Sequence, residues 1–356
     1  MSSQSPRVKD TSAPIRVGVV GLGKMGLLHA AILNSLPESR IVAVAESSAL
    51  PREALARFNP AIKMYPRVEA MLEDCELDAV VIATPVADHV PSATSCIRSR
   101  KPFLIEKPLA VSAAQASDLV RAVQADPLPN MVGFMMRFVD SFEKGKEIVA
   151  SGCLGRLQRA SGTIYVSQLF RRGRGWRYDR QVAGGGVLLS QGSHLIDLLT
   201  WYFGPVARVN ADVLSVYSPE IEDFAHVMLE FRSGLRAWID SSWSVRFRRT
   251  LETTIDILGD NGSLIINDDT VSLFLDQPAA GWSVGKTVWR ASDLYRGVPI
   301  DVGGPPYTRQ AQAFIGALLS QTIPESDVRQ AFHVQQIIDA AYRSSSKAGM
   351  PQEVTA

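Results

Sequence analysis

The sequence predicts an α/β protein with a doubly wound parallel sheet, followed by an α+β domain with an open, largely antiparallel sheet. Two observations predict this class. In the first third of the chain, short and continuously apolar runs alternate with helical patterns, which is typical of a parallel sheet covered on both faces. Beyond about residue 157, β-rich runs follow one another through short turns at 232–234 and 259–262, which is typical of antiparallel pairs.

Composition and charge fit two globular domains. The chain has 356 residues, more than one domain of roughly 150 residues. Its net charge of +1 provides no basic field that would hold nucleic acid. The three cysteines are widely spaced and the histidines lack metal-ligand spacing, so we predict neither a disulfide framework nor a metal site.

The ends of the chain and its apolar runs bear on localisation. Residues 1–14 are polar, rich in Ser and Pro, and lack the apolar core of a secretory signal, so we expect a flexible tail. No segment approaches the roughly 20 apolar residues of a membrane helix. We therefore expect a cytoplasmic protein without a membrane partner.

The first domain is predicted to span residues 15–136. Its expected strands lie at 15–20, 41–45, 79–83, 103–105 and 131–134. The helical segments between them lie at about 24–36, 52–58, 68–73, 89–99 and 112–125. Ser112, with Gln115 three residues later, is a capping-box pattern that marks the start of the last helix.

The second domain is predicted to span residues 137–356 and to serve substrate binding and oligomerisation. Its expected strands lie at 156–166, 208–217, 224–231, 236–243, 252–258 and 263–266. Residues 276–306, rich in Gly and Pro, are predicted to form a loop. Two closing helices are expected at 307–319 and 327–344, and it stays open whether they pack back on the first domain.

A glycine-rich segment follows the first strand directly and opens a helix. Gly21 would permit the tight turn, Gly23 the approach of a pyrophosphate, and Gly26 close packing of helix on strand. The intervening Lys24 and Met25 share this expected cofactor site. An anion here would be stabilised by the free N–H groups of the helix N-terminus. The segment predicts a dinucleotide-binding Rossmann domain.

Glu46 indicates which dinucleotide is bound. It lies 20 residues after Gly26, at the end of the second strand. A carboxylate there accepts hydrogen bonds from the ribose hydroxyls and repels a 2′-phosphate, which favours NAD over NADP. Ser47, Ser48 and Arg52 lie close by, so NADP stays open as the less favoured cofactor.

Three further segments carry residues suited to chemistry. Thr84 and Pro85 follow one buried strand, and Glu106, Lys107 and Pro108 follow the next, at the edge where open α/β sheets bind ligands. Residues 184–197 begin with three glycines and contain Ser190, His194 and Asp197. Their i, i+4, i+7 spacing places these three side chains on one face of a helix.

These four segments, in this order, resemble the Gfo/Idh/MocA family, which includes glucose–fructose oxidoreductase, inositol dehydrogenase and related NAD(P)-dependent sugar dehydrogenases. The resemblance covers nearly the whole chain. It implies a Rossmann domain, then a domain whose open sheet carries the substrate pocket and commonly an oligomer interface, so a homodimer or homotetramer is expected. It also implies that Lys107 lies beside the reacting hydroxyl, Glu106 near the nicotinamide ribose, and Pro108 after a cis bond.

The expected chemistry agrees with this resemblance. Hydride leaves an alcohol carbon only if the hydroxyl proton is removed, and an imidazole with an ordinary pKa of about 6.5 is a suitable base. We therefore assign proton transfer to His194, with the Lys107 ammonium stabilising the alkoxide. Asp197 either orients the ring or is a structural carboxylate. Ser190 stands where many family members carry Asp, so the negative charge of that Asp is missing.

Other residues are assigned to the site by position alone. His89 and Arg137 are expected to reach the cofactor. Tyr165, Trp176 and Arg177 are expected to line the substrate pocket, because Arg suits carboxylate or phosphate recognition and a Trp face suits a sugar ring. The arginine-rich stretch 171–180 has an alternative interpretation as a solvated or interface loop.

Three functions stay open. The first is a dehydrogenase, or ketone reductase, of a sugar, cyclitol or sugar acid. The second uses transient oxidation to eliminate or hydrolyse a glycoside and regenerates NAD. The third is a dinucleotide-binding sensor without turnover, which the presence of both Lys107 and His194 disfavours.

Overall fold

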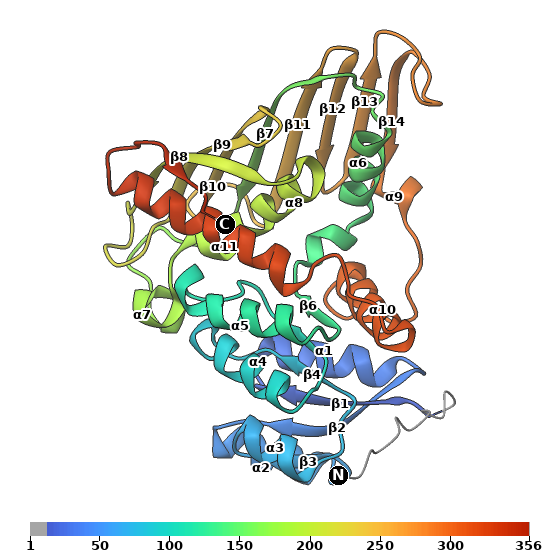
Figure 1. Ribbon diagram of the computed structural model, residues 1–356, viewed down its shortest axis with the longest axis vertical. Helices are drawn as coiled ribbons and strands as arrows, with labels where there is room; N and C mark the ends of the chain where they lie inside the picture. The colour runs from blue at the N-terminus through green and yellow to red at the C-terminus, as the bar shows by residue number, and fades with distance from the viewer. Residues whose placement is uncertain (1–12, 356) are drawn as a thin grey trace.

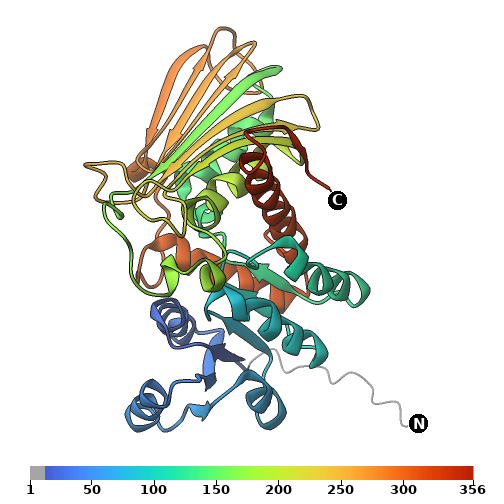
Figure 2. The same ribbon diagram turned by 90° about the vertical axis from the view of Figure 1, so that its left-hand side faces the viewer.

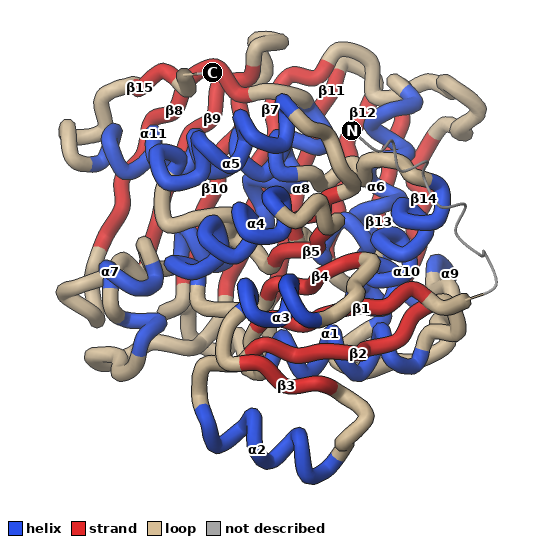
Figure 3. The backbone as a smooth tube through the Cα atoms, turned by 60° about the horizontal axis from the view of Figure 1, so that its bottom comes forward, coloured by secondary structure: helices blue, strands red, loops and turns tan. Residues whose placement is uncertain are grey.

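In the computed structural model, which describes residues 13–355, six parallel strands form the first sheet. Most of the predicted tail, residues 1–12, lies outside the described residues. The strands follow the order β3-β2-β1-β4-β5-β6, with helices on both faces (Figures 1 and 3). They are β1 (Ile15–Val20), β2 (Ser39–Ala45), β3 (Lys63–Tyr65), β4 (Ala79–Ile82), β5 (Phe103–Ile105) and β6 (Asn130–Val132). The helices are α1 (Lys24–Ser35), α2 (Ala49–Phe58), α3 (Val68–Asp74), α4 (His89–Arg98) and α5 (Ala113–Ala125).

The strand order determines where a ligand would bind. Chain order reverses between β1 and β4, and such a switch point opens a crevice beyond the carboxyl ends of the strands. The glycine segment follows β1, Thr84 follows β4 and Glu106 follows β5, so all three meet at this edge. The predicted Rossmann fold is confirmed.

The second sheet has nine strands in the order β14-β13-β12-β11-β7-β10-β9-β8-β15. Every neighbouring pair is antiparallel except β7 and β10. One face is covered by helices, while no described element covers the other (Figure 2). The strands are β7 (Leu157–Tyr165), β8 (Val206–Leu214), β9 (Phe224–Phe231), β10 (Arg236–Ser242), β11 (Glu252–Gly259), β12 (Gly262–Asn267), β13 (Thr270–Leu275), β14 (Gly285–Arg290) and β15 (Gln352–Glu353). The predicted open, largely antiparallel sheet is confirmed.

The helices of this part are α6 (Asp140–Ser151), α7 (Arg180–Ala183), α8 (Ser193–Phe203), α9 (Ala291–Leu294), α10 (Pro305–Ser320) and α11 (Val328–Ser345). Helix α10 packs its apolar face onto the first sheet: Phe314 and Ile315 share a hydrophobic cluster with Val17 and Val19 of β1. Helix α11 packs against α5 of the first domain and against α8 and β8 of the second domain. Within residues 13–355, no helix combines the length and apolar character that a membrane crossing requires.

Several elements differ from the sequence prediction, which did not include strands β3, β13 and β15 or helix α7. The stretch 276–306, expected to be a loop, contains β14 and α9. The strand expected at 131–134 ends at Val132 and is followed by a single 3-10 turn, Met135–Phe138. Helix α6 was missed because Gly145 weakens its helical pattern. That glycine is needed for packing, since a Cβ there would lie 2.3 Å from Cδ1 of Ile266 on β12.

Candidate active site

The glycine segment has the backbone geometry that a phosphate cradle requires. Gly21 has φ +93°, and a Cβ there would lie 2.8 Å from the Ala83 carbonyl oxygen. A Cβ on Gly26 would lie 1.9 Å from the Gly21 carbonyl oxygen. Gly23, which caps α1, has nothing within 4 Å of its Cβ position, so its backbone is open to a bound group. Lys24 is exposed and Met25 half-buried beside it.

Glu46 lies at the end of β2 and is held against this segment. Its two carboxylate oxygens accept hydrogen bonds from the Leu22 and Ser48 backbone N–H groups, both at 2.8 Å. Burial acts to raise the pKa of Glu46, but these hydrogen bonds outweigh it and lower the pKa. The carboxylate is therefore ionised, and each oxygen retains a lone pair for a ribose hydroxyl.

The segment after β4 contains a buried hydroxyl and a buried ring. Thr84 Oγ1 has no hydrogen-bond partner within the described residues, which leaves it available to a ligand. The His89 ring lies between two carbonyl oxygens, with Nδ1 2.8 Å from Pro108 and Nε2 3.1 Å from Thr84. Burial lowers the pKa of His89. The ring thus ties the segment after β4, including Pro85, to the segment after β5.

Glu106 is buried at the end of β5 and has a partner that sequence reasoning missed. His29 Nε2 lies 2.7 Å from Glu106 Oε1, and Oε2 accepts a hydrogen bond from the Lys107 N–H at 3.3 Å. Burial acts to raise the pKa of Glu106, but the His29 hydrogen bond and nearby positive charges lower it overall. His29 lies on α1, three residues after Gly26, and its position in the sequence does not mark it as a partner of Glu106.

Lys107 extends from the segment after β5 towards the second domain. The Lys107–Pro108 peptide bond is cis, as expected. Lys107 Nζ donates a 2.7 Å hydrogen bond to the Ser190 carbonyl oxygen. Burial lowers the pKa of Lys107 to about 8, opposed by the charge of Glu106 and aided by that of Arg177. The amine therefore exchanges a proton near neutral pH.

His194 lies in the first turn of α8, on the second domain. Its side chain is buried, its ring meets Phe134 edge-on at 6.0 Å, and Nδ1 has no hydrogen-bond partner in the described part of the chain. Burial, and then the positive charge of Lys107, holds the pKa of His194 well below its usual range. The imidazole is neutral, and Lys107 is the charged group that acts on its pKa.

The turn between the three glycines and His194 is not a regular α-helix. Residues Leu188–Gly192 form a π-helical turn, a feature that often marks functional sites. The Ser190 carbonyl oxygen accepts hydrogen bonds from both Lys107 Nζ and the Ser193 hydroxyl. The expected i, i+4 spacing of Ser190 and His194 on one regular helical face is therefore replaced by a wider turn.

Buried Glu222 fixes the glycine triplet that precedes this turn. Its Oε1 accepts hydrogen bonds from Gly186 N–H at 2.8 Å, from Leu188 N–H at 3.2 Å and from the Tyr342 hydroxyl at 2.7 Å. A Cβ on Gly186 would lie 1.9 Å from the Glu222 carbonyl oxygen, which explains the glycine. Nothing in the local sequence indicates this partner.

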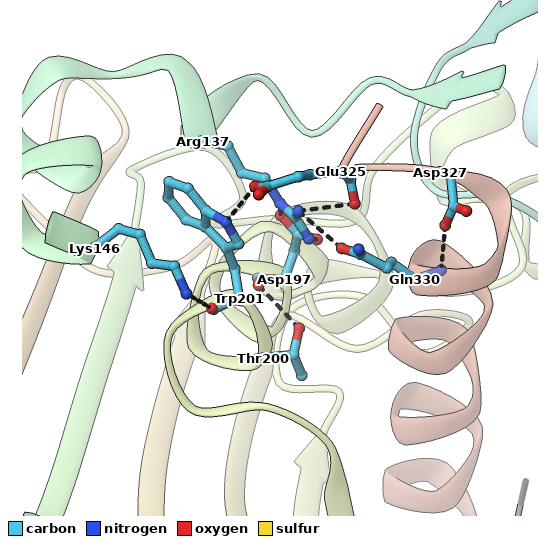
Figure 4. Close-up of polar contacts among 8 residues, drawn as sticks. All are labelled: Arg137, Lys146, Asp197, Thr200, Trp201, Glu325, Asp327 and Gln330. Carbon is cyan, nitrogen blue, oxygen red and sulfur yellow. Dashed lines mark hydrogen bonds and ion pairs between the residues drawn. The ribbon is translucent and has the colours of Figure 1, made fainter. Parts of the chain in front are cut away.

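Asp197 and Arg137 form a buried pair with each other (Figure 4). Arg137 Nε and Nη2 donate to the two oxygens of Asp197 at 2.8 and 2.6 Å, and Nη1 donates to Gln330 and to the Glu325 carbonyl. Trp201 lies against the guanidinium, 5.5 Å from ring centroid to Cζ. Asp197 is thus bound to Arg137, whose remaining hydrogen bonds are with Glu325 and Gln330.

The residues predicted to contact substrate do not all come together. Ser190, Trp176 and Arg177 line one cavity of about 440 Å³, together with Trp243 and Gln191. Tyr165 lies elsewhere: it is four residues after Ser161 on β7, so both side chains are on the same face of the sheet, the uncovered face that carries Trp238 opposite Ser161. Because α8 covers the opposite face, the structure separates Tyr165 from His194.

Two family models match the chain in succession. The oxidoreductase family with an NAD-binding Rossmann fold matches residues 15–134, and the GFO/IDH/MocA C-terminal domain matches residues 142–265.

Individual relatives extend this likeness over the whole chain. The chain is 26% identical to an inositol 2-dehydrogenase of Rubrobacter xylanophilus over 98% of this chain and 95% of that protein. It is also 26% identical to the trans-1,2-dihydrobenzene-1,2-diol dehydrogenase of Mus musculus, over 70% and 73% of the two chains. A levoglucosan dehydrogenase, solved with NADH and L-sorbose, has the same fold, with a TM-score of 0.86, 21% identity and coverage of 96% and 99%. The chain belongs to the Gfo/Idh/MocA family of NAD-binding oxidoreductases.

Proposed function

We propose that this protein is an NAD-dependent dehydrogenase that transfers hydride between the nicotinamide and a hydroxyl-bearing carbon or ketone of a sugar, cyclitol or sugar acid. The proposal is carried by one contact between the two domains, which brings Lys107 towards the turn that precedes His194. Lys107 follows β5 at the nucleotide edge, yet its Nζ binds the Ser190 carbonyl, one turn before His194 on the second domain. An amine and an imidazole at such a junction suit proton transfer to or from an alcohol.

The cofactor would be held by residues whose geometry fits it. Gly21, Gly23 and Gly26, with Lys24 and Met25 at the start of α1, would cradle the pyrophosphate at the N-terminus of that helix. The remaining contacts lie at the ends of β2, β4 and β5 and come from Glu46, Thr84, Pro85, His89 and Glu106.

The choice between NAD and NADP follows from Glu46. Its ionised carboxylate suits the two free ribose hydroxyls of NAD and repels the 2′-phosphate of NADP. Arg52 Nη1 donates hydrogen bonds to the carbonyl oxygens of Glu46 and Ser47, which hold the Arg52 side chain against the turn. NAD is therefore the preferred cofactor.

The protein's own side chains contribute the transfer of one proton. When bound, the nicotinamide supplies the hydride acceptor or donor. In oxidation, neutral His194 takes the hydroxyl proton while the Lys107 ammonium stabilises the alkoxide, so both groups act on the same proton transfer. In reduction, the same proton returns to the carbonyl oxygen. A Lys107 pKa of about 8 keeps both of its forms populated near neutral pH.

The test compares Lys107→Met with the control Lys101→Met. Lys101 is a half-buried lysine of the same domain whose Nζ binds the Leu77 carbonyl, away from the proposed site. With a panel of sugars, cyclitols and sugar acids, Lys107→Met should lower kcat by about 10²–10⁴-fold, while the Kd for NADH stays unchanged. Lys101→Met should keep its activity. Full activity in Lys107→Met would contradict the proposal.

The same panel separates the two other functions. Product formation without accumulation of NADH would indicate glycoside elimination or hydrolysis through transient oxidation. Tight NADH binding without turnover of any compound would indicate a sensor. Both results would contradict a net dehydrogenase.

We also propose that the uncovered face of the second sheet joins two or four copies of the chain. Large apolar side chains are exposed there: Trp238 at 48%, Val288 at 47%, Phe274 at 44% and Ile265 at 42%. Exposed apolar patches of this kind commonly mark interfaces. Light scattering after size-exclusion chromatography should report a dimer or tetramer for the parent protein and a smaller species for Trp238→Glu. A monomeric parent protein would contradict this proposal.

A further inference from the structure

Two adjoining cavities lie at the arginine-rich segment of residues 171–179. The first, of about 440 Å³, is lined in part by Ser190, whose carbonyl binds Lys107, so it adjoins the proposed reacting groups without being lined by them. The second, of about 620 Å³, shares Arg174, Gly175 and Tyr178 with the first. Together they extend from beside the proposed reacting groups along the segment, with volumes within the usual range of ligand pockets.

The charged residues that line the first cavity are all positive, whereas the second is lined by three arginines and two acidic residues. The first cavity contains Arg174 and Arg177 and has no acidic residue in its described lining. The second adds Arg171 and Arg172, and of these only Arg172 forms an ion pair in the described chain, with Glu220. The other acidic lining residue, Asp179, accepts the Gln181 N–H at the start of α7.

The walls of the first cavity suit a ring-shaped ligand. Trp176 is 44% exposed, with the Arg177 guanidinium 4.8 Å from its ring centroid. Tyr178 meets Trp243 edge-on at 6.0 Å, and Trp243 Nε1 donates to Gln191 Oε1 at 2.5 Å. Aromatic faces and amide groups are typical surfaces for a hydroxylated ring.

Position 190, where the Lys107 ammonium is bound, carries no negative charge that would repel an anion. The side chain at position 190 is an uncharged hydroxyl. The Lys107 ammonium there is held by a neutral carbonyl oxygen. The charge of Arg177 also acts on Lys107, which brings the arginine-rich segment within electrostatic range of the proposed chemistry. An anionic ligand would therefore meet positive groups in the first cavity and, at Lys107, beside it.

We propose that the ligand of this site carries an oxyanion, a carboxylate or a phosphate, that Arg174 and Arg177 bind while its ring lies between the aromatic walls and Lys107. The proposal rests on the proposed function for the reaction and names the substrate class. Guanidinium groups bind both oxyanions through paired N–H donors, so the shared chemistry is a planar or tetrahedral oxyanion.

The experiment measures binding separately from turnover. Matched sets of a neutral hexose, its uronate and its 6-phosphate, from glucose, galactose and mannose, are titrated calorimetrically into the enzyme saturated with NADH. Arg174→Gln and Arg177→Gln are compared with Arg246→Gln. Arg246 carries the same charge on the same domain but stacks on Phe170 and lines neither cavity.

In at least one set, an anionic member should bind more tightly than its neutral parent. Arg174→Gln and Arg177→Gln should each weaken that binding by about 10–100-fold, with Arg246→Gln unchanged. The uronate and phosphate arms identify which oxyanion the site prefers. If no anionic member binds more tightly than its neutral parent, or if Arg246→Gln weakens binding equally, the inference is overturned.

Turnover of the same sets keeps the two proposals distinguishable. Oxidation of neutral sugars alone would overturn the oxyanion inference and leave the dehydrogenase intact. Arginine-dependent anion binding without any turnover would support the ligand class and contradict the dehydrogenase.

Discussion

Replacing Ser190 by Asp should move the pH profile of the reaction towards alkaline pH. In the present structure, Lys107 Nζ binds only a neutral carbonyl at residue 190, and burial lowers the pKa of Lys107 to about 8. A carboxylate at about 5 Å and an effective dielectric constant of about 20 would stabilise the ammonium by about 3 kcal/mol. At about 1.4 kcal/mol per pKa unit, this raises the pKa of Lys107 by about 2 units.

The assay is the initial rate of NADH formation between about pH 6 and about pH 11, analysed as kcat/KM for a compound that the panel shows to be turned over. Neutral His194 is able to take the proton throughout this range, and the Lys107 ammonium is the form that stabilises the alkoxide, so kcat/KM falls as pH increases through the pKa of Lys107. The midpoint should lie near 8 in the parent protein and about 2 units higher in Ser190→Asp. Ser190→Asn, which changes shape without adding charge, should keep the midpoint near 8. Equal midpoints for the Asp and Asn variants would refute the reasoning.

Three further substitutions test other parts of the site. Gly26→Ala puts a Cβ 1.9 Å from the Gly21 carbonyl oxygen, so the Kd for NADH in a fluorescence titration should rise by about 10-fold or more; an unchanged Kd would disprove the cradle. Glu46→Gln removes the charge that faces the ribose, so the preference for NAD over NADP in kcat/KM should fall by about 10-fold or more, and an unaltered ratio would exclude Glu46 from that contact. Arg137→Met leaves Asp197 buried without its partner, which should lower the free energy of unfolding in urea by about 3–5 kcal/mol; the double variant with Asp197→Leu should recover most of this loss, and a single-variant cost below about 1 kcal/mol would argue against a tightly held pair.

The parallel sheet and the edge that carries the candidate cofactor residues could be predicted from the sequence because both depend on local patterns. Buried parallel strands have continuous apolar runs, and their carboxyl ends meet at one edge of the sheet. Finding such a strand in the sequence therefore also locates the residues that lie at this edge. Gly21, Glu46, Thr84 and Lys107 all lie at such positions. The weak predictions were at sheet edges. Strand β14 contains Lys286 and Arg290 and is at most half-buried throughout, so its apolar signal is faint.

The contacts that hold the site together could not be predicted in this way, because they join residues distant in sequence. Glu106 and His29 are 77 residues apart, and Asp197 and Arg137 are 60 apart. No helical or strand periodicity in the sequence links residues so far apart. A charged residue in the sequence also gives no sign of whether it binds a ligand or a buried partner. The π-helical turn before His194 was hidden for a related reason, since the i, i+4, i+7 spacing was assessed against a regular helix.

The most direct test of the central claim is a double-mutant cycle on kcat with Lys107→Met, His194→Gln and the two combined. If these groups handle one proton as a unit, each single variant should lose about 10²–10⁴-fold and the double variant little more than either single one. Calorimetry should show NADH bound equally in all four proteins. Losses that multiply, or a single variant that retains full activity, would contradict one proton transfer that involves both Lys107 and His194.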